Sequence, residues 1–350
     1  MGMGNAWILR ASKYGSETAI RDITVYNGKL YGCTGQTGLL LEWNGTNAWA
    51  LKAAQLNSQT IVRHLAVFNE KLYGGTYPGG RLFEWNGTNA WVQKADQLNS
   101  EDDIRALIVF NNKLYGGTSP NGNLFEWNGT DAWVQKAAQL NSEDDIRFLI
   151  VFNNKLYGGT APRGNLFEWN GTNAWVQKAP QLGTGGAIYS MAVFNSKLYG
   201  GTAPNGSLYE WNGTDAWVSK APQLGDETFI YSLGVFNASL YGGTGTSGAE
   251  GLGKLYVWNG TNAWVEKAPQ FGSEGTIRDL AAYRGKLYGS TFGTGLLLEW
   301  DGVDGWSQRA SKPGSEYVIP ALTVFQGRLF GCSADGGALY EWNGGGSLFM

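Results

Sequence analysis

The stretch that decides the fold, residues 132–173, reads AWVQKAAQLNSEDDIRFLIVFNNKLYGGTAPRGNLFEWNGTN. The stretch before it, 90–131, differs only at five aligned positions: Asp96/Ala138, Ala106/Phe148, Ser119/Ala161, Asn121/Arg163 and Asp131/Asn173. The Leu-Tyr-Gly that marks each unit begins at Leu30, Leu72, Leu114, Leu156, Leu198, Leu240 and Leu287, and its last copy is Leu329-Phe330-Gly331. Eight repeats of about 42 residues thus make one domain over residues 1–350, and such a period indicates a solenoid, a propeller or an array.

One repeat reads as four short strands with tight turns between them. Asn153-Asn154 and Asn170-Gly171-Thr172 separate apolar runs, and such residues tolerate the positive φ of a type I′ hairpin turn. Consecutive hairpins predict a four-stranded antiparallel sheet for each repeat. In this repeat the predicted strands are 146–152, 155–160, 165–169 and 174–179.

The two ends of the chain complement one another. Residues 5–11 match the fourth strand of a repeat, whereas residues 338–342 match a third strand that lacks its fourth. Pairing these ends would close a ring and leave no unpaired terminal sheet. We therefore predict an all-β protein, an eight-bladed β-propeller of four-stranded antiparallel blades, closed by an N-terminal strand that completes the last blade.

The sixteen tryptophans fall two per repeat, as at Trp127 and Trp133. Their regular placement predicts packing between blades, with sugar stacking as the alternative. Cys33 and Cys332 occupy a position that holds Gly or Ser in the other repeats, and equivalent strands lie too far apart for a disulfide, so we expect free thiols. These thiols and the absence of an apolar signal segment favour a soluble, cytoplasmic protein and leave the compartment unknown.

The diglycine Gly116-Gly117, followed by aromatic residues six apart at Trp127 and Trp133, resembles the kelch repeat. Kelch repeats are nearer fifty residues and carry Tyr where this chain has Trp127, so the chain is kelch-like. The resemblance implies a propeller that binds a ligand, most often a protein. The composition is also similar to that of short, tryptophan-rich bacterial lectin propellers, which implies a sugar ligand.

The repeats differ mainly in the loop that enters the first strand, in the start of that strand, and in the loop between the second and third strands. Both loops should emerge on one face of the disc, with the varied side chains around the mouth of the central channel. The first variable series is Arg21, Arg63, Arg105, Arg147, Tyr189, Tyr231, Arg278 and Pro320. The second is Asp22, His64, Ala106, Phe148, Ser190, Ser232, Asp279 and Ala321. From these we select as candidate binding residues Arg63, His64, Arg105, Arg147, Phe148, Tyr189, Tyr231, Arg278 and Asp279.

Catalytic groups are scarce. His64 is the only histidine, and no nucleophile motif accompanies it. The acidic runs 101–103 and 143–145 lack the alternation of a calcium loop, and we expect them to be solvated. We expect no enzyme activity, no cofactor and no metal.

The net charge of −3, with scattered basic residues, argues against a nucleic-acid partner, and no apolar run is long enough to span a membrane.

Three hypotheses about function remain. The chain is a non-catalytic scaffold that binds a protein or peptide at the variable face, a multivalent lectin, or a recently amplified or designed repeat protein without a specific ligand. A lectin needs site residues that repeat, whereas a protein-binding face needs residues that differ between blades.

Overall fold

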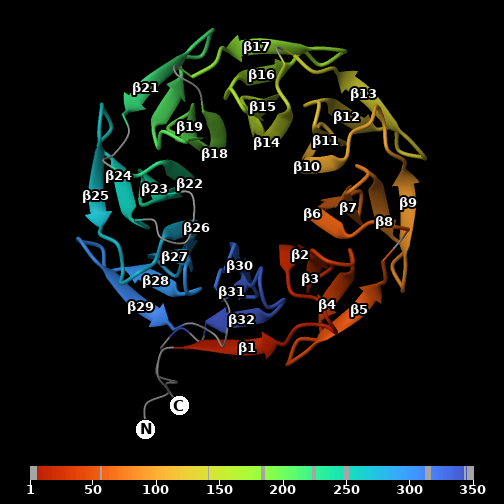
Figure 1. Cartoon of the computed structure of the whole chain (residues 1–350), viewed down its shortest axis with the longest axis horizontal. Coiled ribbons are helices and arrows are strands. Elements are labelled where there is room, and N and C mark those ends of the chain that lie inside the picture. The colour runs from red at the N-terminus through yellow and green to blue at the C-terminus, as the bar shows by residue number, and fades with distance from the viewer. Residues whose placement is uncertain are drawn as a thin grey trace.

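The protein is described from a computed structural model, which defines residues 6–55, 57–140, 142–182, 186–222, 226–246, 252–311, 317–342 and 344. These residues form 32 strands in eight four-stranded antiparallel groups, arranged in a ring around a central space (Figure 1). One residue pair, Gly245 with Thr276, additionally joins two neighbouring groups. The predicted all-β class and the repeated four-stranded sheets are confirmed.

Strands at equivalent places in the repeats share one position in the ring. The innermost are β2 (Ile20–Tyr26), β6 (Ile61–Phe68), β10 (Asp103–Phe110), β14 (Asp145–Phe152), β18 (Ala187–Phe194), β22 (Phe229–Phe236), β26 (Thr276–Tyr283) and β30 (Ala321–Phe325). The second strands are β3 (Lys29–Thr34), β7 (Lys71–Tyr77), β11 (Lys113–Ser119), β15 (Lys155–Ala161), β19 (Lys197–Ala203), β23 (Ser239–Gly245), β27 (Lys286–Phe292) and β31 (Arg328–Cys332).

The outer half of each blade is shorter. The third strands are β4 (Leu40–Trp43), β8 (Leu82–Trp85), β12 (Leu124–Trp127), β16 (Leu166–Trp169), β20 (Leu208–Trp211), β24 (Leu255–Trp258), β28 (Leu297–Trp300) and β32 (Leu339–Trp342). The outermost are β5 (Trp49–Ala53), β9 (Trp91–Ala95), β13 (Trp133–Ala137), β17 (Trp175–Ala179), β21 (Trp217–Ala221), β25 (Trp264–Ala268), β29 (Trp306–Ala310) and β1 (Trp7–Ala11).

The N-terminal strand lies in the last sheet. β1 pairs antiparallel with β32, and Trp7 faces Trp342, so the predicted pairing of the chain ends is found. The same sheet packs against the first full repeat, because Ile20 and Trp43 share an apolar cluster with Phe330 and Leu339. Among the described residues, no helix could cross a membrane.

The two kinds of tight turn have different geometries. Asn153 and Asn154 both have positive φ, 45° and 55°, as a type I′ turn requires. The same prediction for Asn170-Gly171 is wrong, since only Gly171 has positive φ. There the Asn170 Oδ1 accepts hydrogen bonds from the backbone N–H groups of Thr172, Asn173 and Ala174 at 2.9 to 3.2 Å. A side chain rather than a two-residue backbone turn therefore closes this loop.

Tryptophans fill the space between neighbouring blades, as predicted. The ring of Trp127 on β12 lies 4.9 Å from that of Tyr73 on β7 of the preceding blade, and Trp91 Nε1 donates to the carbonyl oxygen of Gly38, also one blade back. Trp127 is 8% exposed and Trp133 is 5% exposed. These rings are therefore not available as a sugar-stacking surface.

Close packing explains why both residues of the diglycine are glycine. A Cβ on Gly116 would lie 3.2 Å from the Trp133 ring of its own blade, and one on Gly117 would lie 2.6 Å from Ile146 of the next blade. Because glycine has no side chain, the Trp133 ring and Ile146 can approach the backbone closely. Cys33 and Cys332 occupy the Gly117 position in their repeats, and both are buried free thiols, as expected.

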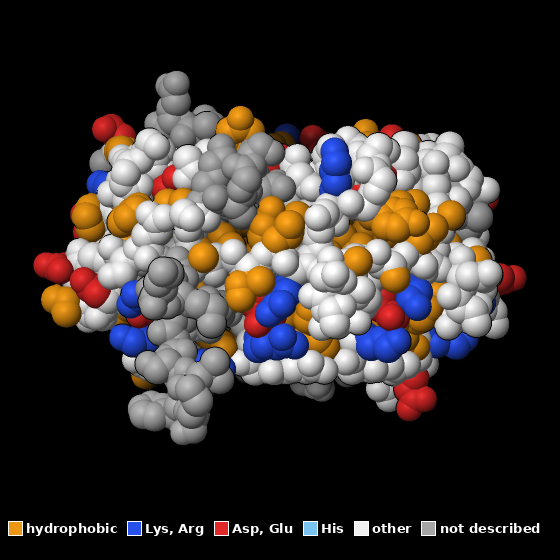
Figure 2. Space-filling view, turned by 90° about the horizontal axis from the view of Figure 1, so that it is seen from below, with side chains coloured by type: hydrophobic (Ala, Val, Ile, Leu, Met, Phe, Trp, Pro, Cys, Tyr) orange, Lys and Arg blue, Asp and Glu red, His pale blue; other side chains and the backbone are white. Residues whose placement is uncertain are grey.

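Hydrophobic side chains are also visible on the outer wall of the disc (Figure 2). A valine of similar exposure recurs on the outermost strands, as at Val134, which is 40% exposed. Near one margin of this wall, Lys and Arg lie beside Asp and Glu (Figure 2). This pattern agrees with the ion pair that recurs between blade residues such as Lys113 and Glu126, 2.9 Å apart.

Candidate functional site

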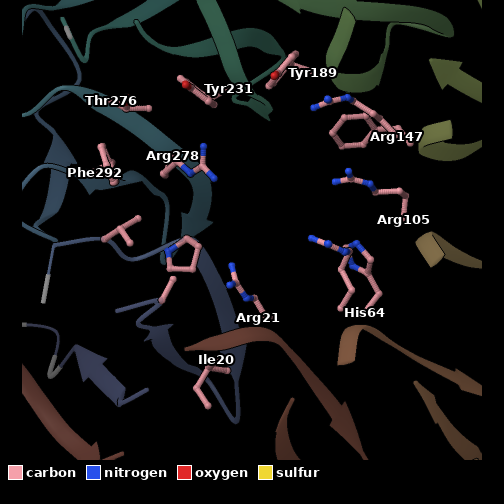
Figure 3. Close-up of a pocket in the computed structure, with 15 residues that line it drawn as sticks. Ile20, Arg21, His64, Arg105, Arg147, Tyr189, Tyr231, Thr276, Arg278 and Phe292 are labelled. Carbon is pink, nitrogen blue, oxygen red and sulfur yellow. The ribbon is translucent and has the colours of Figure 1, made fainter. Parts of the chain in front are cut away.

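The inner strands surround a cavity of roughly 690 Å³. All eight residues of the first variable series line it: Arg21, Arg63, Arg105, Arg147, Tyr189, Tyr231, Arg278 and Pro320. From the second series only His64 and Phe148 do so. Of the nine candidate binding residues, the structure therefore brings eight together and leaves Asp279 out. In Figure 3 the arginines and tyrosines extend from several inner strands toward one open space.

A β-bulge directs every member of the first series except Pro320, which precedes β30, into this cavity. In β14 the pairing with β15 skips Arg147, because Ile146 faces Thr160 and Phe148 faces Gly159. The same register shift leaves out Arg105 in β10 and Tyr189 in β18. A bulged residue is unpaired, and the strand bends around it, which redirects its side chain. The sequence carries no signal for this bulge, and strict strand alternation does not predict it.

Asp279 joins two blades and does not line the cavity. Its two carboxylate oxygens accept hydrogen bonds from the backbone N–H groups of Leu280 and of Leu322 on the next blade, both at 2.9 Å. Asp22 does the same for Leu65 of the next blade. The placement of Asp279 at the cavity is therefore wrong, because this short side chain is held by backbone N–H groups, whereas the longer side chains of His64 and Phe148 reach the cavity from the same position.

Arginines and aspartates alternate across three neighbouring blades. Arg63 Nε donates to Asp103 Oδ1 at 2.8 Å. Arg105 Nε lies 3.0 Å from Asp103 and 3.1 Å from Asp145, and Arg147 Nε lies 3.4 Å from Asp145. Both aspartates are buried. Only the Arg63 contact is a hydrogen bond, and the others are ion pairs that place Arg105 and Arg147 beside buried carboxylates.

The acidic runs are therefore not wholly solvated, contrary to the sequence interpretation, because only their middle residues, Asp102 and Asp144, are exposed. Besides Asp103 and Asp145, Glu101 and Glu143 are fully buried. Glu101 accepts hydrogen bonds from the backbone N–H of Asn121 at 3.1 Å and from the Asn123 side chain. These contacts join the loop before the first strand to the loop between the second and third strands, so both variable loops lie on the same face.

Aromatic side chains occupy the side of the cavity beyond Arg147. The Tyr189 ring meets that of Phe229 edge-on at 5.0 Å, and Phe229 stacks on Tyr231 at 4.9 Å. Arg147 lies over Tyr189 at 4.7 Å, and Arg278 lies over Tyr231 at 4.9 Å. Cation–π contacts of this length are favourable, and they connect the charged and aromatic parts of the wall.

His64 lies at the cavity, and its Nδ1 is 3.9 Å from the Asp22 carboxylate. Burial lowers the pKa of His64 below its ordinary value, and the nearby Asp22 opposes this shift. The imidazole is therefore neutral near pH 7 and adds no charge to the wall. Within the described ranges, no three His, Cys, Asp or Glu side chains form a group that could hold a metal.

No known family model and no curated protein sequence match this chain, and the kelch-like resemblance is not confirmed. Solved structures are similar along nearly its whole length. Sqt1 of Saccharomyces cerevisiae has a TM-score of 0.71 at 12% identity, covering 97% of this chain and 99% of that chain.

YCF48 bound to D1 peptide has a TM-score of 0.58 at 15% identity, covering 99% of this chain and 98% of that chain. The WD40 β-propeller domain of Doa1 has a TM-score of 0.57 at 12% identity, covering 97% of each chain. At such low identities these similarities show the fold alone. The fold is a β-propeller with repeated four-stranded blades.

Proposed function

We propose that this protein is a non-catalytic scaffold that binds a protein or peptide partner at the central cavity and the variable face around it. The observation that carries the proposal is the convergence of eight varied side chains from eight successive repeats on one cavity of roughly 690 Å³. A uniform frame with diversified residues at one site is typical of recognition surfaces.

The ring in this proposal is a closed eight-bladed propeller. The pairing of β1 with β32 and the apolar cluster shared by the first and last blades support closure. A closed ring holds the inner strands rigidly, so that a ligand meets a preformed site.

Two further observations favour a protein ligand over a sugar. The first series contributes five arginines, two tyrosines and one proline, so the cavity wall is not the same in every blade, and the repeated tryptophans are mostly buried. A propeller of the same fold, YCF48, has been solved bound to a peptide. Tyr and Arg are also the residue types that most often dominate binding energy at protein interfaces.

The test is selection of binders from a displayed random peptide library with the full-length protein. We expect selected peptides to bind the wild type and to lose at least about tenfold in affinity when Tyr189→Ala and Tyr231→Ala are combined. The matched control combines Tyr189→Phe with Tyr231→Phe, which keeps both rings and should retain most of the binding.

Two results would contradict the proposal. One is a selection that yields no peptide binder, as expected of a repeat protein without a specific ligand. The other is binding that the Tyr→Ala pair leaves unchanged while thermal unfolding shows both variants folded. A glycan array run beside the selection checks the lectin hypothesis independently.

A further inference from the structure

We propose that the ligand of the central cavity is an acidic peptide segment that also carries aromatic or apolar side chains. Its carboxylates would bind the four arginines contributed by successive blades, Arg21, Arg63, Arg105 and Arg147, and its apolar side chains would contact Tyr189 and Tyr231. This inference rests on the proposed function and names the chemical class of the partner.

The cavity concentrates positive charge in a protein that is negative as a whole. Five arginines line it although the net charge of the chain is −3, and Asp103 and Asp145 behind three of them offset only part of this charge. Clefts lined by one sign of charge focus the field and attract ligands of the opposite sign. An anionic ligand follows from this placement.

Three of the arginines keep N–H donors that no described residue uses. Asp103 and Asp145 contact the Nε atoms of Arg63, Arg105 and Arg147. The terminal nitrogens of these three side chains form no hydrogen bond with any other described residue. In Figure 3 the labelled guanidinium groups of Arg105 and Arg147 reach toward the open centre. A guanidinium has five N–H donors, so each can still bind a carboxylate with its outer edge.

The number of arginines favours several carboxylates over one. A single carboxylate is satisfied by one bidentate arginine, whereas four successive blades each supply a guanidinium here. A segment with several Asp or Glu residues matches this arc. The cavity also has the volume typical of sites that enclose a ligand.

The aromatic part of the cavity wall favours a ligand that is not charged along its whole length. Tyr189, Tyr231 and Phe229 form one packed aromatic cluster there. Half-buried rings in fixed positions contribute most when an apolar group covers them. An acidic peptide with aromatic or apolar residues satisfies both parts of the wall.

The experiment compares two rhodamine-labelled, end-capped short peptides by fluorescence anisotropy at low salt. One alternates Glu with Tyr, and the other has Gln in place of every Glu. We expect the Glu peptide to bind roughly tenfold more tightly than the Gln peptide, and its affinity to fall as salt screens the charges.

The variant arm is Arg21→Gln, because this side chain is exposed and forms no ion pair with the described aspartates or glutamates. We expect about a tenfold loss of Glu-peptide affinity. The charge-matched control is Arg284→Gln, an exposed arginine in the turn between β26 and β27 at the other end of these strands. It should change the affinity less than about twofold.

Three outcomes would overturn the inference. Equal binding of the Glu and Gln peptides that still depends on Tyr189 and Tyr231 refutes the acidic class and leaves the proposed function standing. Failure of both peptides refutes the inference, while the library selection decides the proposed function separately. Tighter binding of a short single-stranded oligonucleotide than of the Glu peptide would replace the peptide with a nucleic acid.

Discussion

Asp103 and Asp145 show how one residue type can serve two blades at once. Each lies between arginines of neighbouring inner strands, and each is buried. Burial raises the pKa of Asp103 although Arg63 and Arg105 oppose the shift. The repeats that carry Ala187 or Phe229 at this position carry Tyr189 or Tyr231 two residues later. Three further repeats, with Ala19, Ile61 or Thr276 at this position, carry an arginine two residues later without the aspartate.

Glu227 is a buried carboxyl group with an incomplete set of partners. It is 1% exposed, and the nearest charged nitrogen is Lys254 Nζ, 3.7 Å away. Burial raises the pKa of Glu227 from 4.5 to about 7. The folded state therefore holds this proton more tightly than the unfolded state does.

The sign of the pH dependence follows from that difference. Between about pH 4.5 and pH 7 the unfolded chain loses the proton while the folded chain keeps it, so this group lowers the free energy of unfolding as pH rises. Glu227→Gln removes the effect. We expect the variant to gain stability relative to the wild type between about pH 5 and pH 7, measured by urea unfolding. The exposed Glu70→Gln serves as control, and an unchanged pH profile in Glu227→Gln would contradict the assignment.

At the scale of elements, the tryptophan on each third strand connects its blade to the preceding one. Trp127 contacts Phe68 at 6.0 Å and Tyr73 at 4.9 Å between ring centres, and all three share one apolar cluster with Ile104. Burial of such a side chain stabilises a fold by a few kcal/mol. The stability of the ring is thus built at the interfaces between sheets.

Trp127→Ala should lower the free energy of unfolding by about 3 to 5 kcal/mol, because it leaves a cavity between two blades. Val134→Ala on the adjacent β13 removes a side chain that is 40% exposed and should cost less than about 1 kcal/mol. Denaturant unfolding monitored by circular dichroism gives both values. A Trp127→Ala protein as stable as the Val134→Ala protein would contradict the packing role.

The elements were predictable from sequence because the repeat supplies the same pattern eight times. Predicted and observed strands in the unit that contains β14 to β17 agree to within one residue at each end. The inner-strand bulge was not predictable, since the residues that follow it, 148–152 in β14, are all apolar and show no alternation that an extra residue could shift. The sequence also could not show that the Asp279 carboxylate accepts a hydrogen bond from the backbone N–H of Leu322 on the next blade.

The acidic runs show a second limit of sequence analysis. Glu101 and Asp103 look like part of a solvated loop when read locally, yet Glu101 bonds to Asn121 and Asp103 pairs with Arg63 of the neighbouring blade. Carboxylates are buried when such partners satisfy them. Only the arrangement of the strands in space brings these partners together.

At the scale of the whole molecule, the ring converts differences between repeats into a single asymmetric site. Inner strands from every blade meet at one cavity (Figure 1). Arginines occupy the first four positions of the first variable series, and two tyrosines follow. The central claim is that this cavity and the variable loops above it bind a peptide partner.

Amide hydrogen exchange, measured with and without the tightest peptide from the library, tests that claim most directly. We expect the peptide to slow exchange in the segments that enter the inner strands, 101–105 and 143–147, and to leave the turns 111–112 and 153–154 at the opposite face unchanged. Slowing confined to those turns or to the outer strands β9 and β13 would contradict the account.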